Sequence, residues 1–137
     1  MTSSSYAVAI IVETPDGIPL VSDPQKPEPR FWKFPGGRNE PGETPIKTAM
    51  RELREETGIS ASLSEMKLIH EETRGAGAEL HGFFVFYAKL SQKPTLLKHG
   101  AGGEEIRFFT SEEIKTMPNF FPNHRTLFSR FVLKAGT

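Results

Sequence analysis

Three glutamates, Glu52, Glu55 and Glu56, stand at the spacing that brings side chains together on one face of an α-helix. Like charges at this spacing repel one another, so the helix itself does not favour the arrangement. A hard cation removes the repulsion, and Mg²⁺ held by carboxylates, water and substrate phosphates is the usual occupant of such a site. The spacing therefore predicts a Mg²⁺ site, with Mn²⁺ as the alternative ion, and chemistry on a phosphate.

A helix over residues 45 to 57 is expected to carry these carboxylates. Thr44 offers a capping oxygen, Pro45 sacrifices no useful donor at the first helical position, and Gly58 suits the left-handed conformation that ends a helix. The stripe expected to pack on the opposite side consists of Ile46, Met50, Leu53 and Thr57. One face of the helix is therefore expected to pack against the core and the other to coordinate the metal ion.

Two further features flank the glutamates. Gly36 and Gly37 precede the helix, and we expect them to turn the backbone tightly and present its carbonyls and amides to a ligand. Arg51 lies beside the acidic face and is expected to hold Glu43 or a neighbouring glutamate through a two-pronged contact, which fixes orientation without reacting.

The stretch from Gly37 to Ile59 reads GRNEPGETPIKTAMRELREETGI and resembles the box that defines the Nudix hydrolases. The resemblance implies an α/β (α+β) fold, an α/β/α sandwich with a central mixed sheet. Residues 1–137 are expected to form a single Nudix domain, with its box at 37–59. The implied reaction is Mg²⁺-dependent hydrolysis of a phosphoanhydride bond in a nucleoside diphosphate linked to another moiety.

The resemblance also implies roles for individual residues. The Gly37 carbonyl is expected to bind the metal with Glu55 and Glu56, while Glu52 is either a further ligand or the base that deprotonates water. Arg51 and Glu43 are expected to be structural. The members of the family often recruit another acidic residue before a late strand, and Glu104 or Glu105 is expected to act here as base or extra ligand, with His99 as a third candidate. Ordinary exposure of these side chains is the alternative.

Composition narrows the class of partner and the compartment. Lys+Arg and Asp+Glu both number 17, giving a formal net charge of +0, so we expect a small-molecule nucleotide ligand, no stable nucleic-acid partner and no membrane. A count of Cys 0 excludes disulfides, zinc–thiolate sites and a cysteine nucleophile. The chain begins with a short polar lead that lacks the features of a signal peptide. A cytoplasmic protein is expected, as a monomer or a homodimer.

The remaining chain predicts strands around the helix and a second helical layer. Strands are expected over 6–13, 18–22, 66–73, 80–90 and 105–109, the first two joined as a hairpin. The proline-rich residues 23–30 are expected to form a loop, Ser111 to cap a helical turn at 112–116, and residues 122–133 to form a helix that packs on the sheet.

Substrate choice depends on weaker signals. The proline and tyrosine that mark relatives acting on ADP-ribose or dinucleoside polyphosphates are missing from 69–77, which favours the MutT-like group that cleaves a nucleoside triphosphate to monophosphate and pyrophosphate. A nucleoside diphosphate sugar or dinucleotide pyrophosphatase is the alternative, and a non-catalytic nucleotide-sensing module is the alternative of another class.

Substrate-binding residues are predicted by side-chain chemistry. Phe34 is expected to stack on a base, with Phe120 or Phe121 at the far rim, and burial of these rings in the core is the alternative. Asn123 is expected to read a purine edge or to cap the last helix. The cations expected to meet phosphate are Arg38, Lys26, Arg30 and Lys33.

Overall fold

The computed structural model describes residues 5–133, and the lead expected at the amino terminus lies almost wholly outside them. Its elements in chain order are β1 (Tyr6–Glu13), β2 (Ile18–Ser22), β3 (Gly36–Arg38), α1 (Pro45–Thr57), β4 (Lys67–Arg74), the short 3₁₀ helix η1 (Gly77–Glu79), β5 (His81–Lys89), β6 (Glu105–Phe109), α2 (Ser111–Thr116), α3 (Pro122–Phe128) and the π-helical continuation η2 (Ser129–Leu133).

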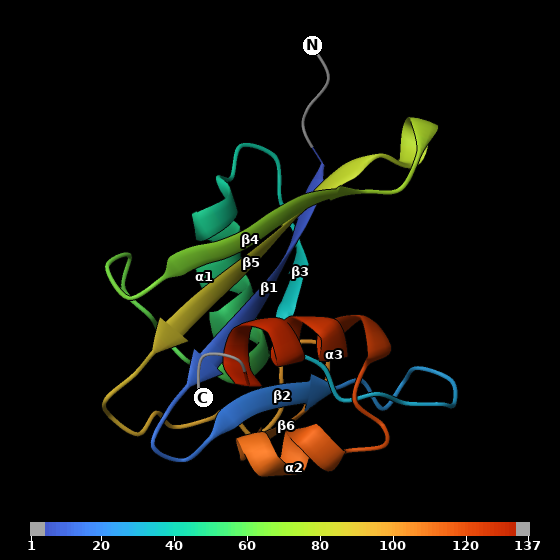
Figure 1. Cartoon of the computed structure of the whole chain (residues 1–137). Coiled ribbons are helices and arrows are strands. Elements are labelled where there is room, and N and C mark those ends of the chain that lie inside the picture. The colour runs from blue at the N-terminus through green and yellow to red at the C-terminus, as the bar shows by residue number, and fades with distance from the viewer. Residues whose placement is uncertain (1–4, 134–137) are drawn as a thin grey trace.

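The central sheet has four strands in the order β3-β1-β5-β4 (Figure 1). β1 and β5 run parallel, whereas β3 pairs with β1 and β4 pairs with β5 in antiparallel fashion. The expected mixed sheet is therefore confirmed.

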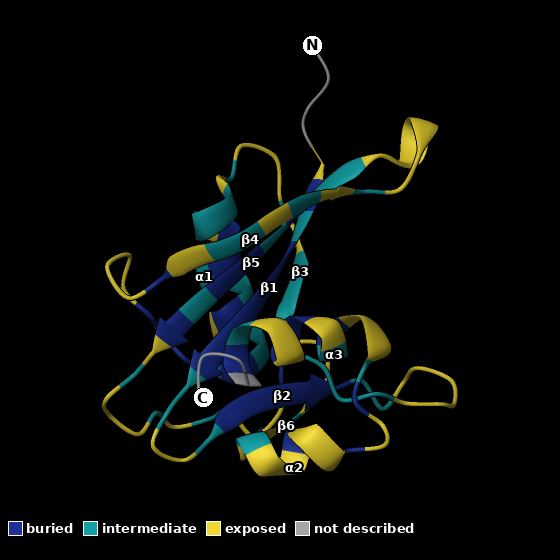
Figure 2. Cartoon of the chain, viewed as in Figure 1, coloured by how far each residue is buried: buried dark blue, intermediate teal, exposed yellow. Residues whose placement is uncertain are grey.

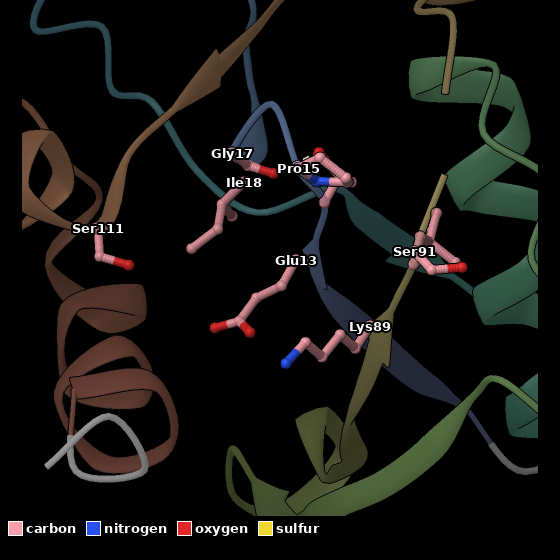
Figure 3. A pocket seen from close by; sticks show the side chains of 9 residues that line it. Glu13, Pro15, Gly17, Ile18, Lys89, Ser91 and Ser111 are labelled. Carbon is pink, nitrogen blue, oxygen red and sulfur yellow. Dashed lines mark hydrogen bonds between the residues drawn. The ribbon is translucent and has the colours of Figure 1, made fainter. Parts of the chain in front are cut away.

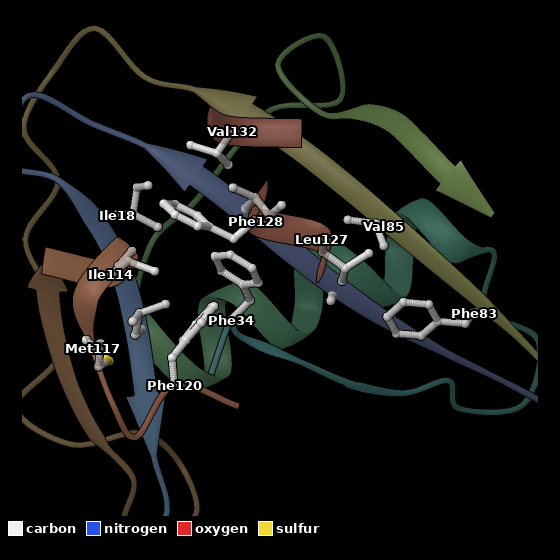
Figure 4. Packing of buried hydrophobic residues seen from close by; sticks show 13 residues of the cluster. Ile18, Phe34, Phe83, Val85, Ile114, Met117, Phe120, Leu127, Phe128 and Val132 are labelled. Atoms are coloured by element: carbon white, nitrogen blue, oxygen red, sulfur yellow. The ribbon is translucent and has the colours of Figure 1, made fainter. Parts of the chain in front are cut away.

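β1 separates two hydrophobic cores because alternate residues of a strand point to opposite faces. Val8, Ile10 and Val12 pack with Leu53 on the α1 side. Ala9 and Ile11 pack on the other side, in the core built around Phe34, Phe120, Leu127 and Phe128 (Figure 4). β1 is almost continuously buried, while α2 and much of β4 are exposed (Figure 2). Helices cover both faces of the sheet, which confirms the α/β/α sandwich.

The expected hairpin between the first two strands is wrong in its pairing. β2 instead pairs with β6 in a separate two-stranded sheet, and only a bridge from Thr14 to Gly17 remains at the turn. β1 cannot accept β2 as a neighbour because β3 and β5 already occupy its two hydrogen-bonding edges.

The ends of the helices show which capping predictions hold. α1 spans Pro45–Thr57 as expected, and Gly58 leaves it with φ 85°. The side chain of Thr44 makes no capping hydrogen bond, however. α2 is capped by Thr110 rather than Ser111, because Thr110 and Glu113 form a reciprocal capping box. Across the described residues, each helix is too short or too polar to span a lipid bilayer.

Candidate active site

Gly36 and Gly37 form strand β3 rather than the expected tight turn. Neither has a positive φ, and they pair with Ala9 and Val8 of β1. Glycine is needed here because neighbouring atoms lie very close to the backbone. A Cβ on Gly36 would lie 2.1 Å from the Val8 carbonyl oxygen, and one on Gly37 would lie 2.6 Å from the Glu52 carboxylate. The missing side chains therefore let the carboxylate helix lie directly against the strand.

Two partly buried carboxylates meet this glycine pair. Glu56 Oε1 accepts a hydrogen bond from the Gly36 amide at 3.1 Å, and the Glu52 carboxylate rests against Gly37. Burial raises the pKa of Glu56 to about 8, with the negative charges of Glu52 and Glu104 adding to the rise. Burial also raises the pKa of Glu52. Negative charge at this position is costly, which is the condition that a bound cation relieves.

Arg51 makes the two-pronged contact that the sequence predicts. Its Nε and Nη2 donate to the two oxygens of Glu43 at 2.7 and 3.0 Å. Its Nη1 donates to Glu52 at 2.7 Å and to Glu55 at 2.9 Å, and Nη2 also reaches the Arg38 carbonyl at 3.0 Å. The Arg51 hydrogen bond lowers the pKa of Glu43 to about 2. One guanidinium thus organises three carboxylates, and these groups with Glu56 are called the carboxylate cluster below.

The carboxylate cluster has the donor chemistry for a hard metal ion. The side-chain donors are all oxygens, those of the three carboxylates on α1, and the Glu52 carboxylate lies against the Gly37 backbone. Within residues 5–133, no three His, Asp or Glu side chains converge as a ready-made metal cage. Glu52 and Glu55 are instead both held by Arg51, and Glu56 is held by the Gly36 amide.

The loop before β6 brings Glu104 toward the carboxylate cluster and leaves Glu105 outside it. The Ala101 amide donates to the Glu55 carbonyl at 3.0 Å, which fastens this loop to the end of α1. The Gly102 amide fixes the Glu104 carboxylate at 3.0 Å. Glu105 is exposed on β6 and lies 4.0 Å from Arg107. His99 is also exposed. Of the two expected glutamates, Glu104 therefore has the better position.

A cleft of about 420 Å³ lies between the proline-rich loop and the start of α3. We call it the proline-loop cleft; it is lined by Asp23, Lys26, Pro27, Glu28, Pro29, Arg30, Phe31, Lys33 and Phe121. The rings of Phe31 and Phe121 are 5.8 Å apart. Lys33 connects the cleft to the carboxylate cluster, because its positive charge is close enough to oppose the pKa rise of Glu56.

The expected stacking role of Phe34 is wrong. Phe34 is 1% exposed and Phe120 is 2% exposed, so both rings lie inside the core on the α3 side (Figure 4). Their edge-to-face contact, with centroids 5.4 Å apart, is a core contact. Phe121 alone of the three expected rings is partly exposed and lines the proline-loop cleft.

Arg38 and Asn123 both have exposed side chains. Asn123 lies within the first turn of α3 and does not cap it, because the N-cap position is occupied by Phe121. The next residue, His124, was not among the predicted site residues, yet it is buried and accepts a hydrogen bond from the Phe34 amide. Helical spacing with Leu127 and Phe128 is the signal that would have placed it on the inward face.

A second hollow, of about 410 Å³, opens at the turn between β1 and β2 (Figure 3). Glu13 and Lys89 border it, and Glu13 accepts a hydrogen bond from the Tyr87 hydroxyl at 2.6 Å. No residue of the carboxylate cluster lines this hollow. No residue of the carboxylate cluster lines the proline-loop cleft either, but Lys33, which lines that cleft, acts electrostatically on Glu56.

Comparison with known proteins defines the class. The profile of the NUDIX domain matches residues 4–131, and the chain therefore belongs to the Nudix family. Members of this family generally use divalent metal ions.

Named relatives match parts of the chain. It is 39% identical over 80 residues to the CTP pyrophosphohydrolase of Escherichia coli (strain K12), covering 57% of this chain and 59% of that protein. It is 36% identical over 78 residues to the putative 8-oxo-dGTP diphosphatase of Bacillus subtilis (strain 168), covering 57% of this chain and 50% of that protein. The chain thus spans 59% and 50% of the length of these two relatives.

Solved structures share the fold. A MutT chain from work on Aliivibrio salmonicida and Vibrio cholerae superposes with a TM-score of 0.72 at 22% identity, covering 96% of this chain and 98% of that one. The NUDIX domain of Shewanella oneidensis NrtR, complexed with ADP ribose, gives a TM-score of 0.76 at 17% identity, covering 100% of this chain and 91% of that one. At these identities the likeness shows the fold alone.

Proposed function

We propose that this protein is a Mg²⁺-dependent nucleotide pyrophosphohydrolase that cleaves a nucleoside triphosphate to the monophosphate and pyrophosphate. The observation that carries the proposal is the carboxylate cluster, which gathers around the Gly36–Gly37 backbone beside a cleft with cationic and aromatic walls. Two of the relatives that match the chain are named for action on CTP and on 8-oxo-dGTP, which supports a nucleotide substrate.

The metal would be held by Glu55, Glu56 and the Gly37 carbonyl, and also by Glu52 if Glu52 is not the base. A bound divalent ion offsets the charge of the phosphates and lowers the pKa of a coordinated water. Arg51 keeps Glu52 and Glu55 side by side, as its Nη1 contacts with both already do. Arg51 is itself held by two hydrogen bonds to Glu43, so it supports Glu52 and Glu55 rigidly.

The protein must also accept a proton when water attacks phosphorus. The new bond joins the water oxygen to phosphorus, the bridging P–O bond breaks, and the proton passes to a carboxylate. Glu52 and Glu104 are the two candidates, since Glu52 lies beside Gly37 and Glu104 is fixed by the Gly102 amide. Pyrophosphate leaves with the electrons of the broken bond.

The proline-loop cleft would hold the rest of the nucleotide. Phe31 and Phe121 offer the faces on which a base can stack. Lys26, Arg30 and Lys33 supply positive charge for phosphates, and Lys33 does so next to Glu56. The exposed side chains of Arg38 and Asn123 remain proposed contacts, to phosphate and to a purine edge respectively.

The test is a substrate panel. Purified protein is incubated with nucleoside triphosphates, nucleoside diphosphate sugars and dinucleotides in Mg²⁺, Mn²⁺ or EDTA, and phosphate release is scored against pyrophosphate release. We expect pyrophosphate from triphosphates, loss of turnover in EDTA, and loss of turnover in Glu55→Gln. Turnover of sugar nucleotides or dinucleotides alone would reassign the substrate. Saturable nucleotide binding without any product in Mg²⁺ or Mn²⁺ would identify a sensing module instead.

A further inference from the structure

Buried His124 makes the last of a series of hydrogen bonds that hold residues 32–34, the segment leading to the candidate active site. The segment before the glycine pair runs beside the residues that precede α3. The Trp32 amide donates to the Asn119 carbonyl at 2.9 Å, and the Phe121 amide donates to the Trp32 carbonyl at 2.8 Å. At Pro122 the partner segment turns into α3. The Phe34 amide therefore donates to a side chain, the Nδ1 of His124, at 3.0 Å.

The surroundings of His124 fix the ring in place. Its side chain belongs to a residue that is 7% exposed. The ring stacks on Phe34 with centroids 5.3 Å apart and planes 21° apart, and Phe121 meets it edge-on with centroids 5.0 Å apart. Burial, with the charges of Lys33 and Arg74, lowers the pKa of His124 to about 3. The imidazole is therefore neutral near pH 7, and Nδ1 is available as an acceptor.

The anchored segment passes directly into the active-site strand. Next to Phe34, the Lys33 amide and carbonyl both pair with Val21, at 3.0 and 2.9 Å. After Phe34, the Pro35 carbonyl accepts from the Ile10 amide at 2.9 Å, and the Gly36 amide donates to Glu56 at 3.1 Å. The backbone from 33 to 36 is thus held at every residue, and His124 supplies the hold at Phe34.

We propose that His124 is a positioning residue that couples the proline-loop cleft to the carboxylate cluster. Through Phe34 it holds Lys33 toward the cleft and Gly36 against Glu56, and through ring contact it supports Phe121 at the cleft wall. This inference rests on the proposed function, because it assigns a role in the reaction that the carboxylate cluster performs. The printed contacts of the buried His124 ring are with Phe34 and Phe121, so its role would be indirect.

A matched pair of substitutions isolates the acceptor. In His124→Asn, the amide oxygen stands the same number of bonds from the backbone as Nδ1 and can accept from Phe34. In His124→Gln, the same amide group stands one bond further out and cannot reach that amide without repacking the buried site. Both variants carry an uncharged carboxamide group, and they differ in the distance of the acceptor oxygen from the backbone.

We expect His124→Asn to retain most of kcat and His124→Gln to lose about 10- to 100-fold of kcat, the scale on which small displacements of catalytic groups act. Both are assayed at a temperature below the unfolding transition that is first measured for each variant. A second readout is independent of turnover: in ¹⁵N-labelled protein, the amide signals of Phe34 and Gly36 should shift and exchange faster in His124→Gln only.

Three outcomes overturn the inference. They are equal kcat in the two variants, an undisturbed Gly36 amide in His124→Gln, and an equal disturbance of both amides in His124→Asn. A wild-type protein that turns over no nucleotide would defeat the proposed function, whereas the amide signals would still decide whether His124 anchors the segment. If His124→Gln does not fold while His124→Asn does, the acceptor is required for the segment to form, which supports the anchoring role.

Discussion

The carboxylate cluster and the proline-loop cleft handle charge in opposite ways. In the cluster, Arg51 is bonded to Glu43, Glu52 and Glu55, so most charged groups already have a partner. In the cleft, the ammonium groups of Lys26 and Lys33 form no ion pair with any carboxylate of residues 5–133. The cluster is organised before any ligand arrives, whereas in the cleft Arg30 lies 3.8 Å from Glu28 and only Lys26 and Lys33 are left for the ligand. The first arrangement suits chemistry common to many substrates, and the second suits selection among them.

The largest effect is expected from a substitution of Glu56, a partly buried carboxylate of the cluster. Glu56→Gln should lower kcat by about 100-fold or more, because it removes the negative charge of a proposed metal ligand that helps to stabilise the transition state. The melting temperature should stay within a few degrees of wild type, since the amide oxygen can still accept from Gly36. Steady-state kinetics and thermal unfolding measure the two quantities. Glu71→Gln, on the exposed side of β4, is the control. Wild-type kcat in Glu56→Gln would contradict the site.

A smaller effect comes from breaking the internal order of the cluster. Arg51→Lys keeps the charge and loses the planar fork that holds three carboxylates. Its side chain is 17% exposed, so we expect the free energy of unfolding to fall by about 2 kcal/mol. Urea denaturation measures it. Arg54→Lys, an exposed arginine on the same helix, should change little. Equal losses in the two variants would show that the cluster is not specially organised.

The junction between the two regions should respond to pH. The unfolded chain protonates His124 near its ordinary pKa of about 6.5, whereas the folded protein keeps that pKa at about 3. Below pH 6.5 the unfolded state therefore binds the extra proton, and stability falls as pH falls. The loss from this residue should be about 1 to 2 kcal/mol between pH 6.5 and 5. Urea denaturation across this range should show a weaker pH dependence in His124→Asn. An unchanged slope would contradict burial of a neutral ring.

The smallest effect sharpens the role of the cleft. Phe31→Ala should raise KM for a nucleoside triphosphate about fivefold and leave kcat within a factor of about two, because loss of one stacking face weakens binding by about 1 kcal/mol. Kinetics on the preferred triphosphate measure this split. Leu80→Ala, an exposed apolar residue at 56% exposure, is the control. A fall in kcat with unchanged KM would place Phe31 in the chemistry and erase the contrast between the two regions.

Much of the fold was predictable because its signals are local. The helix over Pro45–Thr57 was predicted with its bounds, since proline and glycine set its ends and side-chain spacing set its faces. β1, β2 and β6 were predicted with their bounds from residue type and turn signals. Pairing was not predictable in this way. β2 joins β6 because β1 has no free edge, and that depends on strands distant in sequence.

The same division holds within the candidate site. The contact between Arg51 and Glu43 was predicted because both lie in or beside one helix, where spacing fixes distance. Phe34 was misassigned because its neighbours Phe120 and His124 come from the far end of the chain. The glycine pair was expected to form a turn. Glycine is required there for another reason: a side chain at either position would collide with Val8 of the neighbouring strand or with Glu52 of α1.

The sequence by itself determined the family and the position of the carboxylates, because residues spaced three and four apart lie on the same face of a single helix. The tertiary structure alone decided that Glu104 rather than Glu105 approaches the carboxylate cluster, that Phe31 and Phe121 line the proline-loop cleft, and that the Phe34 amide donates to His124. Each of these depends on side chains brought together by packing from segments far apart in the chain, and no local spacing encodes such distances.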